Sequence, residues 1–333
     1  MSIILQEIKE IISKIDFSEL NNKKILITGA SGLVGIHILS CLKELSKSIN
    51  IDISVWIHND VSIEFVEIFD DCKIIKKDIT KLDSFDSLPT YDLIIHSAGY
   101  GQPDKFMEDK LKTLLINTLS TNELFKKLNI GGKFIFLSTS EIYSGLDEQN
   151  ISETKIGLTN TNHPRSCYIE GKRCGESICY IYKEIGFDVK IIRLSLAYGP
   201  GTKKNDKRVL NSLIQKGLFY EKIKLLDSGS AIRTYAYISD VIEMIWNITL
   251  FGKEILYNVG GKSITSIYDL AVLIGKKLNK PIEISQDIRE DGNPKIVNIS
   301  IDKYMYEFPN KNFTSLEDGI DKTINWQKKI YDK

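Results

Sequence analysis

The sequence has little of several features that would place it in simpler classes of protein. Its five cysteines include no CxxC pair, and its four histidines show neither an HxH nor an HExxH spacing. Disulfide-rich secreted domains and histidine-based metal sites depend on such patterns. We therefore expect a reduced, cytoplasmic protein that binds no metal.

An excess of charge and a long apolar run are also missing. Among 333 residues, Lys+Arg and Asp+Glu are both 44, whereas nucleic-acid binders show a basic excess or stripe. No apolar run approaches the ~20 residues that span a bilayer. The first residues, "MSIILQEIKEIISKIDF", lack the basic start of a signal peptide. We expect neither a nucleic acid nor a membrane as partner.

What the chain does have, from Lys23 onward, is a regular alternation of short apolar strands with helical segments. This alternation predicts an α/β fold with a doubly wound parallel sheet, covered by helices on both faces. The expected strands are "KKILIT", "DISVWI", "CKIIKKD", "YDLIIHSA", "GGKFIFLST" and "DVKIIRLSL".

The same patterns predict how the chain divides. An accessory helix is expected within residues 1–22, and a dinucleotide-binding Rossmann domain over 23–195, to which the chain returns near 234–260. A smaller C-terminal substrate lobe is expected over 196–233 and 261–333. Two segments near and in this lobe, "RTYAYISDVIEMIWNI" and "SITSIYDLAVLIGKKL", have apolar spacings that favour helix over most of their length.

Three glycines mark the turn after the first strand. In "ITGASGLVGIH", Gly29, Gly32 and Gly35 lie between a strand and the start of a helix. There, backbone N–H groups and the helix N-terminus can face a pyrophosphate, and a side chain would hold the backbone away from it. The turn therefore predicts a dinucleotide cofactor.

The residues at the end of the second strand help to distinguish NAD from NADP as the cofactor. It reads "VWIHND", with His58 and Asn59 where an acid usually binds the adenosine ribose hydroxyls. We predict NAD, with NADP as the alternative, because a 2′-phosphate near His58 is conceivable. In "KDIT", Asp78 and Ile79 are placed to flank an adenine.

A tyrosine and a lysine on one helix suggest the chemistry. In "RSCYIEGK", Tyr168 and Lys172 are four residues apart and so share a helix face. A nearby ammonium is expected to lower the pKa of the phenol, which can then take the proton of an alcohol as hydride leaves its carbon. Tyr220 and Lys224 have the same spacing in "FYEKIKLLDSG", but they lack this setting and are interpreted as structural.

The segment "FLSTSEIYSG" follows the fifth strand, at the edge of the sheet where doubly wound folds bind ligands. Thr139 can form a hydrogen bond to the oxygen that Tyr168 deprotonates. Glu141 adds a carboxylate, which a second proton transfer beside a new ketone would require. A strand-end cap and a solvated turn residue are the alternative interpretations of these two residues.

The chain resembles extended short-chain dehydrogenases/reductases that act on nucleotide sugars, most closely UDP-glucuronate decarboxylases and their relatives. The segments "STSEIY", "PRSCYIEGKR", "DKRVLNSLI" and "RTYAYISDV" carry this resemblance, which extends from Lys23 to about residue 330. It implies that Thr139, Tyr168 and Lys172 are catalytic, assisted by Glu141 and Ser140, and that Arg208 and Arg233 face the substrate diphosphate. We further predict Tyr100 as a substrate contact, and as cofactor contacts Ser31, Leu33, Val34, Ser97, Ala98, Gly99 and Asn117, in addition to Tyr168 and Lys172.

Three positions depart from the family pattern besides the missing acid of the second strand. Leu196 replaces an asparagine near the sugar diphosphate, and "EDGNPKI" lacks the arginine that decarboxylases place before the proline to hold the sugar carboxylate. Lys295 and Arg165 are possible substitutes for that cation. Ser140 stands where dehydratases have an aspartate, so the choice of reaction stays open.

The predicted function is therefore an NAD(P)-dependent enzyme that oxidises C4 of a nucleotide-diphosphate sugar. Dehydration, decarboxylation or epimerisation would follow, in surface-polysaccharide sugar biosynthesis. The alternatives are a C4 dehydrogenase that releases the 4-keto sugar and a non-catalytic dinucleotide sensor. We also expect a homodimer that uses the helices around 105–128 and 168–185.

Overall fold

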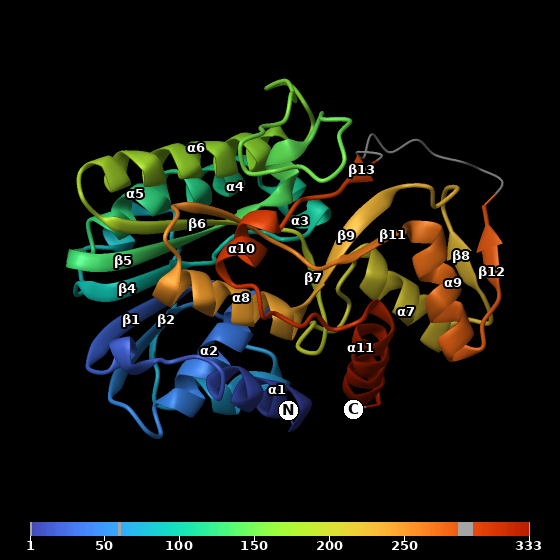
Figure 1. Ribbon diagram of the computed structural model, residues 1–333, viewed down its shortest axis with the longest axis horizontal. Helices are drawn as coiled ribbons and strands as arrows, with labels where there is room; N and C mark the ends of the chain where they lie inside the picture. Colours follow the sequence, from blue (N-terminus) through green and yellow to red (C-terminus); the bar gives the residue numbers. More distant parts are fainter. Residues whose placement is uncertain (1, 59–60, 286–295, 333) are drawn as a thin grey trace. The chain divides into compact units, whose positions relative to one another are not determined.

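A seven-stranded sheet forms the centre of the first of two units in the computed structural model, which describes residues 2–58, 61–285 and 296–332 (Figure 1). The strand order is β10-β6-β5-β4-β1-β2-β3. The strands are β1 (Lys23–Thr28), β2 (Ile51–Trp56), β3 (Lys73–Ile75), β4 (Tyr91–His96), β5 (Leu128–Thr139), β6 (Asp188–Leu194) and β10 (Leu256–Val259).

The strands at the middle of this sheet are buried on both faces. β1 pairs in parallel with β2 and β4, and β5 pairs in parallel with β4 and β6. Ile25, Leu26 and Ile27 in β1 are all fully buried, as expected for a parallel strand with helices above and below. Strand order reverses between β1 and β4, and the crevice outside the carboxyl ends of such strands is where doubly wound folds bind ligands.

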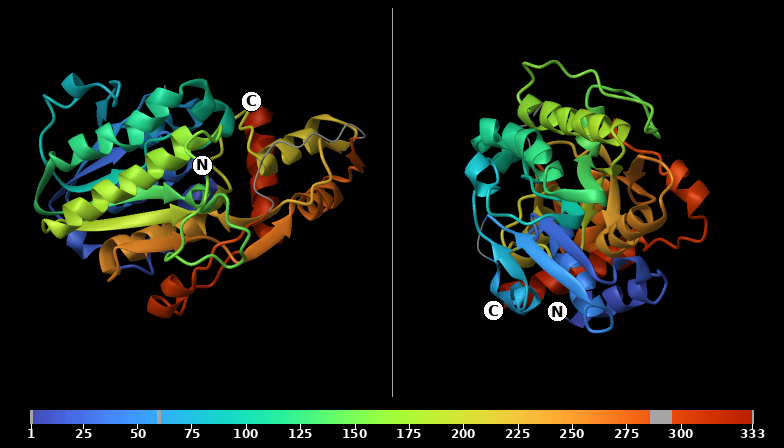
Figure 2. Two further views of the ribbon diagram at one scale, coloured as in Figure 1. Left: turned by 90° about the horizontal axis from the view of Figure 1, so that it is seen from above. Right: turned by 90° about the vertical axis from the view of Figure 1, so that its left-hand side faces the viewer.

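Helices cover both faces of the sheet, which confirms the predicted doubly wound fold. On one face lie α4 (Lys110–Asn117), α5 (Leu119–Phe125) and α6 (Ser166–Glu184). On the other lie α1 (Ser2–Ile12), α2 (Leu33–Leu45) and much of α8 (Ile238–Phe251). α4 and α6 pack side by side, as the views of Figure 2 also show, and the short helix α3 (Pro103–Glu108) precedes them.

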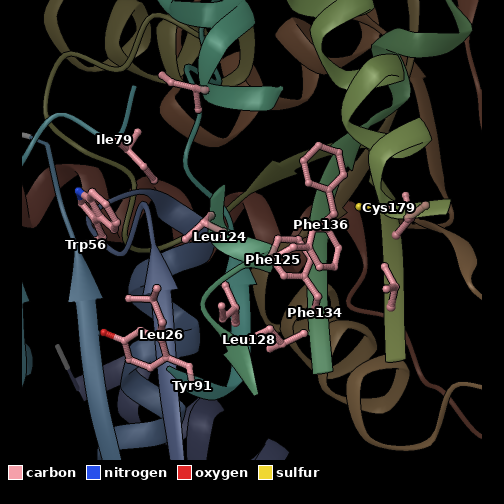
Figure 3. Close-up of a cluster of buried hydrophobic side chains, with 14 of the residues drawn as sticks. Leu26, Trp56, Ile79, Tyr91, Leu124, Phe125, Leu128, Phe134, Phe136 and Cys179 are labelled. Atoms are coloured by element: carbon pink, nitrogen blue, oxygen red, sulfur yellow. The ribbon is translucent and has the colours of Figure 1, made fainter. Parts of the chain in front are cut away.

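An aromatic cluster fixes α5 and α6 against the sheet (Figure 3). The Phe125 ring stacks on the rings of Phe134 and Tyr182 with centroid distances of 3.9 Å in both cases. Phe125, Phe134 and Phe136 are at most 1% exposed, and the burial of each such ring stabilises the fold by roughly 1.5–3 kcal/mol. This packing sets the height of α6 over the end of β5, where Thr139 lies.

The second unit comprises Tyr143–Leu158, Ser195–Val241 and Asn258–Lys333. Its larger sheet has the order β11-β9-β13, with β7 also paired to β9, and β8 pairs with β12. Its strands are β7 (Leu196–Tyr198), β8 (Ile223–Leu225), β9 (Ile232–Tyr237), β11 (Ser263–Ser266), β12 (Ile282–Ile284) and β13 (Ile296–Val297). Its helices are α7 (Val209–Phe219), α9 (Ile267–Leu278), α10 (Asp302–Glu307) and α11 (Leu316–Tyr331).

Two segments expected to be helical over most of their length are helical over most of it, but each begins with a strand that the spacings did not predict. Ile232–Tyr237 forms β9 before α8, and Ser263–Ser266 forms β11 before α9. The two strands pair antiparallel with each other, so a contact between segments about thirty residues apart overrides the local helical spacing. Within the described ranges, none of the helices has the length and apolar character to cross a bilayer.

Candidate active site

The glycine loop after β1 is as tightly packed as a dinucleotide site requires. Gly29 has a φ of +70°, and a Cβ there would approach the Ala98 backbone to 2.7 Å. A Cβ on Gly35 would lie 2.4 Å from the Gly29 carbonyl oxygen. Side chains at either position would therefore push apart the loop, the first turn of α2 and the end of β4.

Hydrogen bonds tie the ends of β1 and β4 together at this loop. The ring of His96 contacts the Thr28 hydroxyl through Nδ1 at 2.7 Å and the Ile116 carbonyl oxygen through Nε2 at 3.1 Å. The Ala98 N–H donates to the Thr28 hydroxyl oxygen at 3.1 Å. Burial, and then the charge of Lys172, lower the pKa of His96 to about 3, so the ring is neutral. The sequence interpretation missed both Thr28 and His96.

The loop residues fit a dinucleotide pyrophosphate. α2 begins at Leu33 directly after Gly32, so its first N–H groups point out of the helix end. Gly32 is exposed, and the other predicted contacts around the loop are partly exposed: Ser31, Leu33, Val34, Ser97 and Ala98. Backbone donors and small side chains therefore line the turn at the point where strand order reverses.

Asp78 and its neighbours form a polar group after β3. The Asp78 carboxylate accepts hydrogen bonds from the Thr80 N–H and hydroxyl at 3.0 and 2.7 Å, and from Lys112 Nζ at 2.9 Å. Burial alone would raise the pKa of Asp78, but these donors lower it to about 2. Ile79, the next residue, is buried. Burial raises the pKa of the half-buried Tyr100, whereas the charge of Lys112 lowers that pKa.

Three other predicted cofactor contacts have different surroundings. His58 is exposed just beyond β2, and Asn59 lies outside the described residues. Asn117 is 1% exposed and donates from Nδ2 to the Thr113 carbonyl oxygen, whereas its Oδ1 has no hydrogen-bond partner within the described part of the chain.

Tyr168 lies between Thr139 and an aromatic wall. Its ring stacks on Phe106 of α3, with centroids 4.7 Å apart and an interplanar angle of 2°. Burial raises the pKa of Tyr168 to about 12, while a hydrogen bond with Thr139 acts in the opposite direction. The charge of Glu141 raises this pKa further and that of Arg165 lowers it. The expectation of a lowered pKa for this phenol is therefore wrong.

The surroundings of Lys172 also differ from that expectation, although burial is the main cause of the raised pKa of Tyr168. The side chain is 4% exposed, and its Nζ donates to the Leu137 carbonyl oxygen at 2.6 Å and lies 4.8 Å from the centroid of the Phe136 ring. Burial lowers the pKa of Lys172 to about 7, although the charge of Glu176 acts in the opposite direction. Near neutral pH the amine is only partly charged, so it offers the phenol less electrostatic help than an exposed lysine would. A Cβ on Gly99 would lie 3.8 Å from Nζ.

Glu141 follows Thr139 and Ser140, both at most 7% exposed, on a short 3₁₀ turn (Ser140–Tyr143) at the end of β5. The Glu141 N–H donates to the Thr139 hydroxyl oxygen at 3.2 Å. Its carboxylate Oε1 accepts from Arg165 Nη2 at 2.9 Å. The structure thus gathers Thr139, Ser140, Glu141, Tyr168 and Lys172 in one place, with Arg165 beside them.

Glu176, one helical turn after Lys172 on α6, forms a buried ion pair with Arg193. Glu176 accepts hydrogen bonds from Arg193 of β6 at 2.7 to 3.2 Å and from the Ser138 hydroxyl of β5 at 2.5 Å. The side chains of Glu176 and Arg193 are each 5% exposed. This network joins the helix of Tyr168 to the strand of Thr139. The spacing of Glu176 from Lys172 was visible in the sequence, but its partners on the sheet were not.

The two arginines expected at the substrate diphosphate lie in the second unit. Arg208, at the start of α7, is held by the buried Asp206 carboxylate at 2.7 to 3.1 Å, and its Nη1 donates to the Ala197 carbonyl oxygen at 3.2 Å. Arg233 lies in β9, where its Nη1 donates to the Ile232 carbonyl oxygen at 2.8 Å. Leu196 begins β7 and is 38% exposed.

The second tyrosine–lysine pair has a different geometry. Tyr220 follows the end of α7 in an extended conformation, and Lys224 lies in β8. The pair therefore shares no helix face, although its spacing equals that of Tyr168 and Lys172.

A Rossmann sheet with a glycine loop at its switch point, and a helix that brings Tyr168 and Lys172 to Thr139 at a strand end, define an extended short-chain dehydrogenase/reductase. The model of the NAD dependent epimerase/dehydratase family matches residues 25–260, and the chain belongs to this family. The predicted cofactor NAD and the predicted class, an NAD-dependent enzyme that modifies nucleotide sugars, are confirmed at the level of the family.

The comparisons also identify individual relatives. The chain is 29% identical over 317 residues to UDP-glucuronic acid decarboxylase 1 of Xenopus tropicalis, covering 94% of this chain and 74% of the relative. It is 28% identical over 316 residues to the Danio rerio protein of the same name, covering 93% and 73%. The structure of UDP-glucuronic acid 4-epimerase from Bacillus cereus, solved with UDP-glucuronic acid and NAD, matches with a TM-score of 0.78 at 25% identity. That match covers 92% of this chain and 100% of the epimerase.

Proposed function

We propose that this protein oxidises the C4 hydroxyl of a nucleotide-diphosphate sugar and then moves a proton at C5, in a reaction that ends in dehydration or decarboxylation. The observation that carries the proposal is the convergence of Thr139, Tyr168 and Lys172 with the Glu141 carboxylate beside the glycine loop. The names of the relatives, which include UDP-glucuronic acid decarboxylases and an epimerase, support the substrate class.

In the first step, Tyr168 takes the proton of the C4 hydroxyl, and Thr139 holds the same oxygen through its own hydroxyl. Bound NAD supplies the acceptor for the hydride that leaves C4. The fully stacked Phe106 ring fixes the plane of the phenol, so little orientation is lost when substrate binds. Lys172, next to Gly99, is placed to contact the cofactor and to share the proton with the phenol.

In the second step, Glu141 acts on the carbon beside the new ketone. A C4 ketone acidifies the C5 hydrogen, and a carboxylate within reach can take that proton or return one. Removal of the C5 proton leads to loss of water across C5–C6, whereas loss of carbon dioxide from a uronic acid leaves C5 to be protonated. Both outcomes use a carboxylate at the position of Glu141.

Epimerisation and release of the 4-keto sugar need no group that acts at C5. A carboxylate oxygen that is buried without a donor, as Oε2 of Glu141 is among the described residues, is costly to keep unless it serves a purpose, and this favours the two C5 outcomes. The test is the mass of the product formed from UDP-, GDP-, CDP- and dTDP-sugars, including UDP-glucuronic acid. A product lighter by water or by carbon dioxide supports the proposal. A product of unchanged mass, or one lighter by two hydrogens, contradicts it.

The second unit is proposed to hold the diphosphate. A guanidinium binds phosphate oxygens through two parallel N–H groups, and Arg208 and Arg233 are the candidates. Asp206 fixes the guanidinium of Arg208 through both of its carboxylate oxygens, which would present the remaining N–H groups in a set orientation.

Three finer expectations join this proposal. We propose a homodimer formed by the helices around 105–128 and 168–185, because Ile181 of α6 and Ile185 at its C-cap are exposed apolar side chains. We also propose that the product serves surface-polysaccharide biosynthesis, a common use of modified nucleotide sugars. A cytoplasmic location, where such substrates are made, stays a prediction.

A further inference from the structure

The ion pair between Glu141 and Arg165 involves only half of the Glu141 carboxylate. Arg165 Nη2 donates to Oε1 at 2.9 Å, and the side chains of Arg165 and Glu141 are 15% and 24% exposed. Oε2 is buried and accepts no hydrogen bond from any residue that the structure describes. A buried carboxylate oxygen without a donor is unfavourable, so its position requires an explanation.

Arg165 is itself held in place by the wall that orients Tyr168. Its guanidinium carbon lies 5.3 Å from the centroid of the Phe106 ring, and the same ring stacks on Tyr168. Arg165 is also the N-cap residue directly before α6, three positions before Tyr168. The orientation of the Glu141 carboxylate is therefore coupled to the wall around the phenol through a single guanidinium.

We propose that Arg165 is a positioning residue, which holds Oε1 of Glu141 and thereby keeps Oε2 as the atom that moves the C5 proton. This inference rests on the proposed function and adds the residue that sets the geometry of its second step. Oε2 takes the proton from C5, and the electron pair of the C–H bond passes to the C4 carbonyl as an enolate. The resulting carboxylic acid can return that proton, or one exchanged with solvent, to C5.

The sequence suggested another task for Arg165, that of holding the carboxylate of a uronic acid substrate. In the structure its Nη2 is occupied by Glu141. A substrate carboxylate at the same guanidinium would bring two negative charges to one cation at a largely buried site. These two roles make different predictions, which a comparison of substrates can separate.

The test is an exchange experiment in D₂O with NAD and either UDP-glucose or UDP-glucuronic acid. Deuterium at C5 is measured by mass spectrometry and NMR, and hydride transfer by the absorbance of reduced cofactor in the first turnover. Arg165→Met should lose C5 exchange by a factor on the order of 100, as expected for a misplaced catalytic group. Hydride transfer, compared after correction for any shift of its pH profile, and the KM for both sugars should stay within a few-fold of wild type.

Two further variants sharpen the comparison. Arg165→Lys keeps the charge but not the planar fork, so it should lose part of the C5 exchange while it keeps the pH profile of hydride transfer. Its result also stands if the methionine variant does not fold. Lys110→Met removes an exposed positive charge whose field reaches Cys167 of α6, and, because Lys110 is not one of the groups placed at the site, it should behave as wild type.

Three outcomes would overturn the inference. A raised KM for UDP-glucuronic acid alone, with C5 exchange intact, would make Arg165 a ligand of the substrate carboxylate. Equal losses of hydride transfer and C5 exchange would make it a general support of the site. Failure of the wild-type protein to reduce NAD with any nucleotide sugar would instead refute the proposed function itself, and this inference with it.

Discussion

Tyr168 is the residue on which the proposed reaction depends most. Tyr168→Phe should lose turnover by at least ~100-fold, the contribution typical of a general acid–base group. It should still bind NAD, because the stack on Phe106 needs only the ring. Tyr220→Phe is the matched control, since Tyr220 has the same spacing to a lysine but is 65% exposed. Near-normal turnover of the Tyr168 variant would remove this residue from the mechanism.

The charges around the phenol predict how the first step depends on pH. The phenolate takes the hydroxyl proton, so hydride transfer should accelerate as pH rises through the pKa of Tyr168. The charge of Glu141 raises that pKa and the charge of Arg165 lowers it. Glu141→Gln should therefore move the rising limb to lower pH, and Arg165→Met should move it to higher pH. The measurement is first-turnover formation of reduced cofactor over a pH series, and shifts in one common direction would contradict the prediction.

At the scale of residues, the sequence could predict the groups that share a short motif. Tyr168 and Lys172 lie on one helix, and Thr139 ends β5 directly before the turn that holds Glu141, so each pair could be placed from its spacing together with the elements around it. Phe106 and Arg193 come from other elements, and only tertiary packing brings them to the site. The raised pKa of Tyr168 could not be predicted from the sequence either, because it depends on how deeply the phenol is buried.

At the scale of elements, the glycine loop allows a direct test of the cofactor site. Gly35→Ala should weaken NAD binding by at least ~10-fold, because the backbone must move away from a Cβ that lies 2.4 Å from the Gly29 oxygen. Gly101→Ala is the control, since a Cβ there meets nothing within 4 Å. Binding is measured by titration calorimetry, and thermal melting reports whether each variant folds. Equal affinities of the two variants would argue against a pyrophosphate at this loop.

The Glu176–Arg193 pair joins α6 to the sheet, so its loss should lower the free energy of unfolding. Glu176→Gln leaves the Arg193 guanidinium buried without its counter-charge, a change that typically destabilises a protein by about 3–5 kcal/mol. Lys126→Met breaks the exposed pair with Glu123 and should change the free energy of unfolding little. Urea denaturation measures both. A Glu176 variant as stable as the Lys126 variant would show that the buried pair is dispensable.

The strands of the parallel sheet were predictable because their apolar runs are continuous and separated by helical segments. β9 and β11 were not, because the first residues of both have spacings that also suit the helix that follows. Each is a strand because it pairs with the other across the second unit. Local pattern therefore identified buried elements well, and it did not reveal the short strands that depend on a distant partner.

At the scale of the whole molecule, the predicted homodimer can be tested on α6. Ile178, Ile181 and Ile185 follow one another at helical spacing, and Ile181 and Ile185 are 57% and 67% exposed. Burial of this stripe against a second copy would favour association. We expect a dimer in light scattering and a monomer for Ile181→Lys. A monomeric wild-type protein would contradict the prediction.

The division of the chain into units involves contacts that no local pattern reveals. The sequence placed the Rossmann domain over 23–195, whereas Tyr143–Leu158 groups with the second unit. Within that unit, Ile151 forms a bridge with Ile299, and Asn258 Nδ2 donates to the Ile151 carbonyl oxygen at 3.0 Å. These partners are more than a hundred positions apart, so only the folded chain shows that they belong together.

The packing of the first helix against the rest of the chain can be followed by fluorescence. Ile4, Ile8 and Ile11 of α1 are buried, and the Phe17 ring that follows meets Trp246 edge-on at 5.3 Å. Trp246 is fully enclosed, so in a variant with Trp56 and Trp326 replaced by Phe its fluorescence should be blue-shifted for as long as residues 1–22 stay docked. A red shift on mild heating, before the rest of the chain melts, would turn this indole into an optical reporter for release of the N-terminal segment.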